Sequence, residues 1–206
     1  QDRQLIALFN RYGMKATFNQ NSGIQSRTNP FRVGNTMVQR LNQKGMKELY
    51  RGHEIASHAL THANLKGMDE ETVYNEIAAD IRNLEAFYEQ KIVGFAYPFG
   101  TYDDQAVKVL KDCGIQYART VECTHDFALQ TDLLRFKASF HHSDAAIMEG
   151  IERFLRSDTE EPQLLYIWGH SYEFTVDDNW VHMENILKKL AFRDDIYYGT
   201  NAEVLL

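Results

Sequence analysis

Three of the eight histidines in this 206-residue chain fall within one segment, GHEIASHALTHANL, which covers residues 52–65. His58 and His62 are four residues apart, so their imidazoles would share one face if the segment turns helically. Two neutral imidazoles held in this way form half of a site for a divalent metal such as Zn²⁺. The alternative is a chance spacing whose side chains cap a helix or face solvent. For His53 we expect a buried, hydrogen-bonded structural histidine.

Two further stretches place polar groups at the ends of apolar runs. YPFG, residues 97–100, predicts a sharp turn that could aim backbone N–H groups into a cleft, with a plain loop as the alternative. LLYIWGH, residues 164–170, predicts an apolar strand ending in His170, with Trp168 on the same side and Tyr172 two residues later. A histidine between aromatic rings suits a general acid facing a sugar-like substrate, or a core histidine bonded to a neighbouring glutamate.

The elements that must position these residues alternate between amphipathic helices and short apolar runs. Helical patterns cover 2–12, 69–88, 103–113, about 144–156 and a stretch from Trp180, and they lead into KATFNQ, GFAYP, IQYART, QLLYIWGH and DIYYGT. This alternation predicts parallel strands joined by crossover helices, in a barrel or in an open doubly wound sheet. Ligands of both folds bind at the carboxyl ends of the strands. We expect residues 21–35 to form a loop over that end.

Composition and charge narrow the class of protein. A chain that is 44% hydrophobic and 25% charged predicts one domain spanning residues 1–206. The net charge of −7, without a basic stripe, argues against nucleic acid as a partner. No apolar run approaches the roughly 20 residues that span a bilayer, and no start resembles a signal peptide, which favours a cytoplasmic location. Because the chain begins with Gln, we expect that a preceding segment has been removed.

Taken in order, YGMKATFN, GHEIASHALTHANL, YPFG, CGIQYART and YIWGH resemble the motifs of the polysaccharide deacetylase family, the NodB-homology group of carbohydrate esterases. The resemblance covers nearly the whole chain. It implies an α/β fold, a distorted and incomplete (β/α) barrel of parallel strands. It also implies that His58 and His62 bind a catalytic divalent metal, most often zinc, with cobalt or nickel as alternatives.

The same resemblance implies roles for the residues at the other strand ends. The backbone N–H of Phe99 would bind an oxyanion, and His170 would protonate the leaving amine. Trp168 would line the pocket for the acetyl methyl group. Together with Tyr97 and Tyr172, it would form an aromatic cleft for the substrate.

The sequence departs from the family pattern at its first motif, a strand ending in two aspartates and a glycine that supply a base and a third metal ligand. This motif is absent from the chain. We expect the natural protein to carry it, because an internal parallel strand cannot be lost without exposing the backbone of its neighbours. The alternative is an inactive relative. Asp2 is expected to cap the first helix instead of replacing the base.

Two more departures concern the groups that assist the base and the acid. Ala96 stands where the family has an arginine, and Arg135 could replace that arginine. The family's later aspartate motif is also absent, and His141 or His142 could tune or replace the acid histidine. Positions in surface loops are the alternative for all three residues.

These observations predict metal-dependent hydrolysis of an N-acetyl group, or of an O-acetyl group, on a carbohydrate. A second reading keeps the metal and replaces the substrate by a small cyclic amide or ureide. A third is a carbohydrate-binding relative that has kept the aromatic cleft and lost catalysis.

Overall fold

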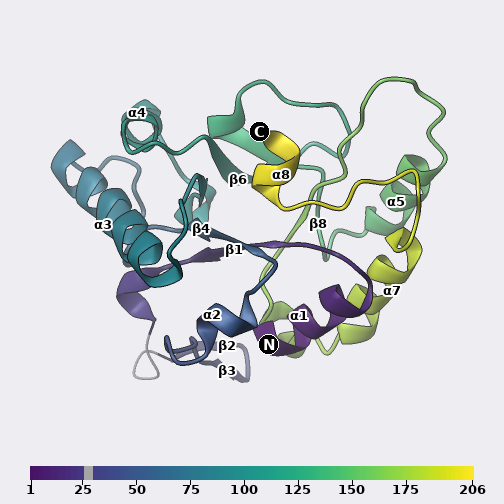
Figure 1. Cartoon of the computed structure of the whole chain (residues 1–206), viewed down its shortest axis with the longest axis horizontal. Helices are drawn as coiled ribbons and strands as arrows, with labels where there is room; N and C mark the ends of the chain where they lie inside the picture. Colours follow the sequence, from purple (N-terminus) through teal and green to yellow (C-terminus); the bar gives the residue numbers. More distant parts are fainter. Residues whose placement is uncertain (26–29) are drawn as a thin grey trace.

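A computed structural model describes residues 1–25 and 30–206, and its centre is a five-stranded parallel sheet with the order β1-β4-β5-β6-β7 (Figure 1). The strands are β1 (Thr17–Gln20), β4 (Glu54–Ser57), β5 (Gly94–Ala96), β6 (Tyr117–Cys123) and β7 (Phe136–Ala138). Two small sheets flank it, the antiparallel pair of β2 (Phe31–Val33) and β3 (Thr36–Val38) and the parallel pair of β8 (Phe140–His141) and β9 (Ile167–Trp168). The central sheet does not close on itself, so the expectation of an incomplete barrel is confirmed.

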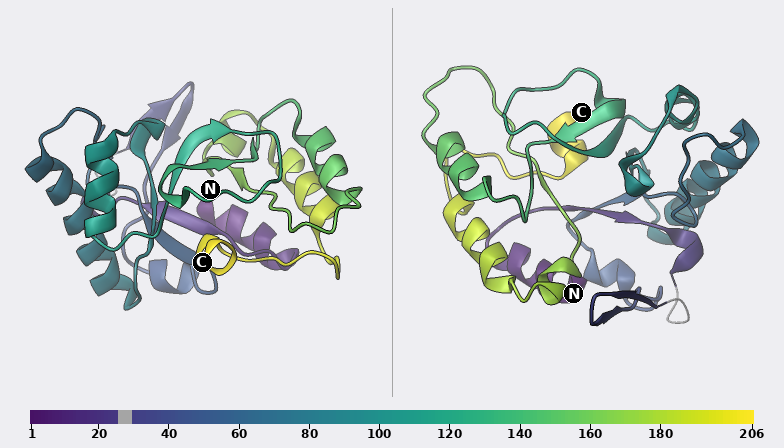
Figure 2. Two further views of the ribbon diagram at one scale, coloured as in Figure 1. Left: turned by 90° about the horizontal axis from the view of Figure 1, so that it is seen from above. Right: turned by 180° about the vertical axis from the view of Figure 1, so that it is seen from behind.

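Helices connect the parallel strands and form two groups at opposite ends of the molecule (Figures 1 and 2). One group contains α3 (Glu70–Tyr88) and α4 (Asp104–Asp112), and the other contains α1 (Asp2–Arg11), α5 (Ile147–Leu155) and α7 (Trp180–Leu190). The short helices are α2 (Met46–Leu49), α6 (Glu173–Val176) and α8 (Asn201–Leu205), with 3₁₀ turns at η1 (Ser22–Ile24), η2 (Pro98–Gly100) and η3 (Leu133–Arg135). None of the described helices has the length and apolarity needed to cross a bilayer.

Capping residues begin α3 and α4 where the sequence pattern placed them. The carboxylate of Asp69 accepts the backbone N–H of Thr72 at 2.9 Å, and that of Asp103 accepts Ala106 N–H at the same distance. Each bond satisfies a donor that the first turn of a helix leaves without an intrahelical partner. Gly114, with φ of 84°, follows the end of α4 and turns the chain toward β6.

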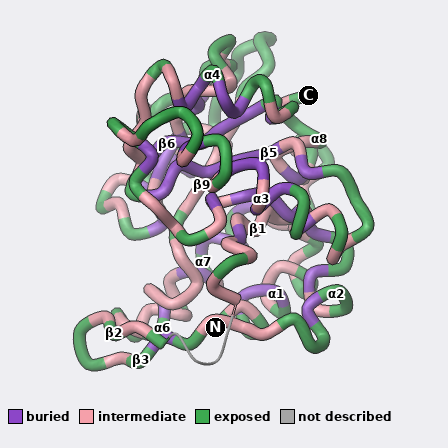
Figure 3. The backbone as a smooth tube through the Cα atoms, turned by 90° about the vertical axis from the view of Figure 1, so that its left-hand side faces the viewer, coloured by how far each residue is buried: buried purple, intermediate pink, exposed green. Residues whose placement is uncertain are grey.

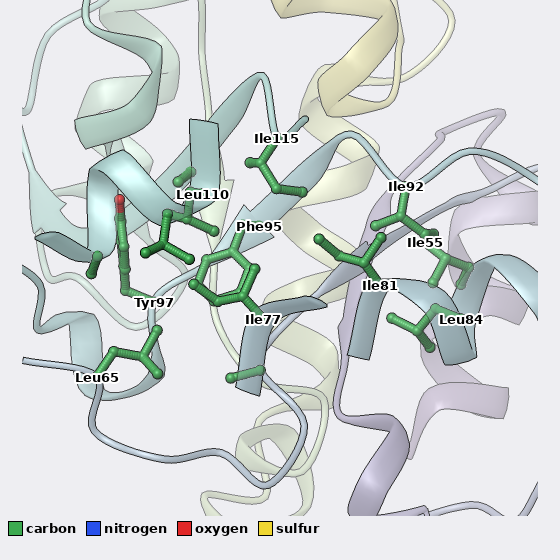
Figure 4. Packing of buried hydrophobic residues seen from close by; sticks show 14 of the residues in the cluster. Ile55, Leu65, Ile77, Ile81, Leu84, Ile92, Phe95, Tyr97, Leu110 and Ile115 are labelled. Atoms are coloured by element: carbon green, nitrogen blue, oxygen red, sulfur yellow. The ribbon is translucent and has the colours of Figure 1, made fainter. Parts of the chain in front are cut away.

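Two hydrophobic cores hold the helices to the strands. The first lies between the central strands and helices α3 and α4, and Figure 4 shows its side chains around Phe95. The second joins α1, α5 and α7 to β8 through Phe140, and Phe18 of β1 packs against both cores. In Figure 3 the buried residues concentrate along the central strands, whereas the β2–β3 hairpin is largely exposed.

Three segments differ from the sequence-based expectations. DIYYGT, expected as a last strand, is irregular and leads into α8, and the expected strand before His170 is reduced to the two residues of β9. A strand needs a hydrogen-bonded neighbour, and here a cavity of about 880 Å³ lies between these segments and β1, which is an edge of the sheet. The expected loop over 21–35 contains η1 and β2, which forms a hairpin with β3 just beyond it, while its residues 26–29 lie outside the described part of the chain.

Candidate functional site

His58 follows directly after β4, at the carboxyl end of a strand inside the sheet. Its Nδ1 lies 2.6 Å from the carbonyl oxygen of Ala96 in β5, so Nδ1 carries the proton and Nε2 keeps its lone pair. Burial lowers the pKa of His58 to about 3, although the bond to Ala96 opposes the shift. The imidazole is therefore neutral at physiological pH, which is the state that binds a metal.

His62 reaches His58 through an irregular turn, and the helical turn that the spacing suggested is not formed. Ala59 and His62 both have φ of 62°, a left-handed conformation that is uncommon for residues other than glycine. The two ring centroids are 4.7 Å apart at an interplanar angle of 78°. Burial lowers the pKa of His62 as well, so both imidazoles are neutral and close enough to share a cation.

A buried aspartate of α3 accepts hydrogen bonds from the carboxyl end of β4. The carboxylate of Asp80 accepts the N–H of Ser22 at 2.6 Å, the hydroxyl of Ser57 at 2.6 Å and the N–H of His58 at 3.3 Å. Asp80 is fully buried, and burial raises its pKa although the three donors stabilise the carboxylate. Asp80 was not predicted as a site residue from the sequence. Its signal is an acidic residue on the apolar stripe that includes Ile77 and Leu84.

The Pro-aromatic-Gly turn lies beside the two histidines. The ring of Phe99 is 62% exposed and 4.6 Å from the ring of His62. Phe99 has φ of 58°, and no acceptor within the described residues binds its backbone N–H, whereas the N–H of Gly100 donates to Tyr97 O at 2.9 Å. A strained turn that leaves an N–H available is consistent with the oxyanion role expected for Phe99.

The other side of the cavity carries the residues that follow β9. Trp168, His170 and Tyr172 line it together with His58 and His62. The rings of His170 and Tyr172 are stacked with centroids 5.1 Å apart. The structure thus brings five of the seven expected site residues to one cavity, whose volume suits a small ligand or part of a chain.

Glu173, in the first turn of α6, is the centre of a histidine cluster on this side. It accepts hydrogen bonds from His170 Nδ1 at 3.0 Å and His170 N–H at 2.7 Å, and from His142 Nε2 at 2.8 Å. His141 Nε2 lies 3.3 Å from the same carboxylate. Burial by itself raises the pKa of Glu173, but the bonds from the imidazoles outweigh it and hold the pKa far below its usual range. Glu173 is therefore a permanent anion and a poor proton acceptor.

Arg119 of β6 supplies a guanidinium at this site, where Arg40 also lines the cavity, whereas Arg135 does not line it. Ala96 and Arg119 are paired in the register of β5 and β6, so Arg119 lies beside the position where the family resemblance expected an arginine. Arg119 is 6% exposed, lines the cavity and stacks on Trp168 at 4.3 Å. Among the described residues, no carboxylate lies within ion-pair distance of it. Arg135 instead pairs with Asp104 and Asp132 near the surface.

Two other residues have roles that differ from those expected, and a third has the expected role. Tyr97, expected in the substrate cleft, is 1% exposed, and its hydroxyl donates to Leu134 O at 2.8 Å, so it belongs to the core. Asp2 does not cap α1, because its carboxylate accepts the hydroxyls of Tyr50, at 2.5 Å, and Ser171. His53 is buried and its Nδ1 accepts the N–H of Ala16 at 3.2 Å, which matches the structural role expected for it.

His58 and His62 fit a metal as two of its ligands. The bond from His58 Nδ1 to a carbonyl is the arrangement that orients metal-binding imidazoles through Nε2. Among the described residues, however, no Asp, Glu or Cys completes a group of three with them. The described residues therefore offer two candidate ligands for a divalent metal at this position, together with a proton donor candidate and an N–H group at the adjacent turn.

Comparisons with known proteins identify the family of the chain. The polysaccharide deacetylase family model matches residues 1–118, which is more than half of the chain. YxkH of Bacillus subtilis (strain 168), named as a polysaccharide deacetylase, is 27% identical over 115 residues. The match covers 54% of this chain and 37% of YxkH, so the chain spans little more than a third of that relative.

Solved structures show the same fold. A Mycobacterium smegmatis protein described as a polysaccharide deacetylase is 16% identical with a TM-score of 0.69, and the match covers 99% of this chain and 75% of that one. BA3943 of Bacillus anthracis, described as a CE4 family pseudoenzyme, is 16% identical with a TM-score of 0.54, and the match covers 99% of this chain and 60% of that one. The family model, the open parallel sheet and the histidines at its strand ends lead to one conclusion: this chain belongs to the polysaccharide deacetylase family.

Proposed function

We propose that this chain is a metal-dependent carbohydrate deacetylase domain that hydrolyses an N-acetyl group, or an O-acetyl group, and releases acetate. The observation that carries the proposal is the meeting of His58, His62 and His170 at one cavity with Trp168 and Arg119. Membership of the deacetylase family supports carbohydrate deacetylation as the reaction. The site residues and the metal are our assignment.

His58 and His62 would hold the divalent metal, most simply zinc, through one ring nitrogen each. When bound, such a metal supplies Lewis acidity at the acetyl carbonyl and makes a water acidic enough to react near neutral pH. The N–H of Phe99 would donate to the carbonyl oxygen as negative charge develops on it.

His170 is the proton donor in this proposal. Glu173 accepts its Nδ1–H, which fixes the ring and leaves Nε2 as the atom that transfers a proton to the leaving nitrogen. Trp168 and Tyr172 supply apolar walls for the acetyl group and the sugar ring. The guanidinium of Arg119, buried and without a described carboxylate partner, is suited to bind the acetate product.

A second function has one specific observation in its favour. None of the described residues supplies the carboxylate that would complete the metal site and take the proton of the water. A domain without this carboxylate would bind acetylated carbohydrate and leave it intact. BA3943 of Bacillus anthracis, a protein with this fold, is described as a pseudoenzyme.

Acetate release distinguishes the two functions. The zinc-loaded chain would be incubated with N-acetylated and O-acetylated oligosaccharides, and acetate would be quantified by NMR. We expect release from one class of substrate, and a loss of about 10²–10⁴-fold in His170→Gln, which removes the transferable proton. His125→Ala, an exposed histidine paired with Asp144, is the matched control and should keep the wild-type rate.

Two outcomes would contradict the proposed catalysis or the role of His170 in it. If no acetylated carbohydrate yields acetate while the same sugars bind the chain in isothermal titration calorimetry, the domain is a binding module. Equal rates in the wild type and His170→Gln would remove His170 from the mechanism.

A further inference from the structure

The cluster around Glu173 has the composition of a metal site in its own right. Among the described residues, His141, His170 and Glu173 are the one group of three whose possible ligand atoms all lie within 4.8 Å of one another. Two imidazoles and one carboxylate form a common zinc ligand set that leaves a fourth position open.

The distances in this cluster are close to those that zinc requires. Ligand atoms at about 2.0–2.1 Å from a tetrahedral zinc are separated from each other by about 3.3 Å. His141 Nε2 lies 3.3 Å from Glu173 Oε2, and His170 Nδ1 lies 3.0 Å from Glu173 Oε1, the other oxygen of the same carboxylate. Because the possible ligand atoms all lie within 4.8 Å of one another, a cation could take the place of the hydrogen bonds once the side chains move closer together.

Neighbouring groups already support these atoms in the manner of an outer ligand shell. His142 Nε2 donates to Glu173 Oε2 at 2.8 Å, and the hydroxyl of Ser143 lies 2.7 Å from His141 Nδ1. Without a metal, His141 Nδ1 also accepts the N–H of Ser143 at 3.2 Å, so Nε2 carries the proton. Metal binding through Nε2 would move that proton to Nδ1, with no net loss of a proton from the ring, and Nδ1 would then donate to the Ser143 hydroxyl.

We propose that His141, His170 and Glu173 form a second divalent-cation site, separate from the His58 and His62 pair, whose occupancy inactivates the acid. A cation on His170 Nδ1 displaces the proton that is bonded to Glu173, so the ring can no longer act as an imidazolium donor. The inhibitory consequence rests on the proposed function of His170, whereas the site itself does not. Zinc beyond the first equivalent should then slow acetate release.

Zinc titration of variants tests the site without reference to activity. The chain would be stripped of metal with a chelator and titrated with zinc chloride by calorimetry in the His58→Ala, His62→Ala double variant, which lacks the first pair. We expect about one equivalent to remain bound, and a further His141→Ala or Glu173→Gln change to abolish it. Adding His125→Ala instead should leave that equivalent in place, because His125 pairs with Asp144 outside the cluster.

Two results would overturn the proposal. One is a double variant that binds no zinc although its circular dichroism spectrum is unchanged. The other is the same equivalent in the variants that lack His141 or the Glu173 carboxylate. Because the double variant lacks His58 and His62, failure of the proposed function would appear separately, as an absence of acetate release in the wild type.

Discussion

Replacement of Asp80 by asparagine tests how the site is built, because this side chain joins three segments beneath His58. In the wild type, the Ser22 N–H, the Ser57 hydroxyl and the His58 N–H share the two carboxylate oxygens of Asp80. An asparagine offers these three donors one acceptor oxygen. At least one buried donor loses its partner, and the remaining bonds lose their charge. Each such loss costs about 1–3 kcal/mol, so we expect Asp80→Asn to lower the free energy of unfolding by about 2–4 kcal/mol.

Urea denaturation at pH 7, followed by circular dichroism, measures this loss as a shift of the midpoint with an unchanged slope. Asp112→Asn is the matched control, since Asp112 is an exposed acid at the end of a helix and, among the described residues, forms its ion pair with Lys108. Its change should stay within about 0.5 kcal/mol. Asp80 also positions His58 through a hydrogen bond to its backbone N–H. The affinity of the His58 and His62 pair for zinc should therefore fall about tenfold or more in Asp80→Asn and stay unchanged in Asp112→Asn.

A small effect would refute this reasoning. If Asp80→Asn costs less than about 0.5 kcal/mol, the wild-type carboxyl is already protonated and the three bonds do not depend on its charge. An unchanged zinc affinity in a destabilised variant would limit Asp80 to a role in the core.

Three further predictions concern other buried residues. Burial lowers the pKa of His53 below its ordinary value of 6.5, so the unfolded chain binds a proton there first and stability falls as the pH drops below about 6.5. Urea denaturation between pH 7 and pH 5 should therefore show a smaller loss in His53→Gln than in the wild type, and equal losses would contradict the assignment. Tyr97→Phe removes the bond to Leu134 O and should cost about 1 kcal/mol in urea denaturation without affecting sugar binding or acetate release. A loss of binding would return Tyr97 to the cleft. In Gly94→Ala the new methyl group would lie 2.0 Å from the hydroxyl oxygen of Tyr117, so the variant should lose at least about 1–3 kcal/mol. An unchanged melting temperature in calorimetry would show that Tyr117 moves freely.

The elements that could be predicted from the sequence are those with local signals. α3 and α4 carry their own caps and apolar stripes, and β1, β5 and β6 lie in the sheet where the alternation of helices and strands placed them. The segment DIYYGT has the β-propensity of a strand, but strand formation also requires a neighbour, which no local pattern reveals.

The residues of the candidate site also fall into those with a local sequence signal and those that only the fold brings together. His58 and His62 could be found from their spacing of four residues, and His170 because it ends an apolar run, and the structure brings all three to one cavity. Arg119 could not be found in this way, because it lies next to Ala96 only through the pairing of β5 with β6. The two residues are 23 positions apart in the chain. Tyr97 was misplaced since Phe99, two residues later in the turn, contacts His62, while the ring of Tyr97 itself packs into the core.

The most direct test of the central claim, that His58 and His62 hold the catalytic metal, is anomalous diffraction from crystals of the zinc-loaded chain at the zinc absorption edge. We predict a peak about 2.0–2.1 Å from a ring nitrogen of both residues. A second peak among His141, His170 and Glu173 would belong to the additional site. Density at that cluster alone, with none between His58 and His62 at saturating zinc, would contradict the account.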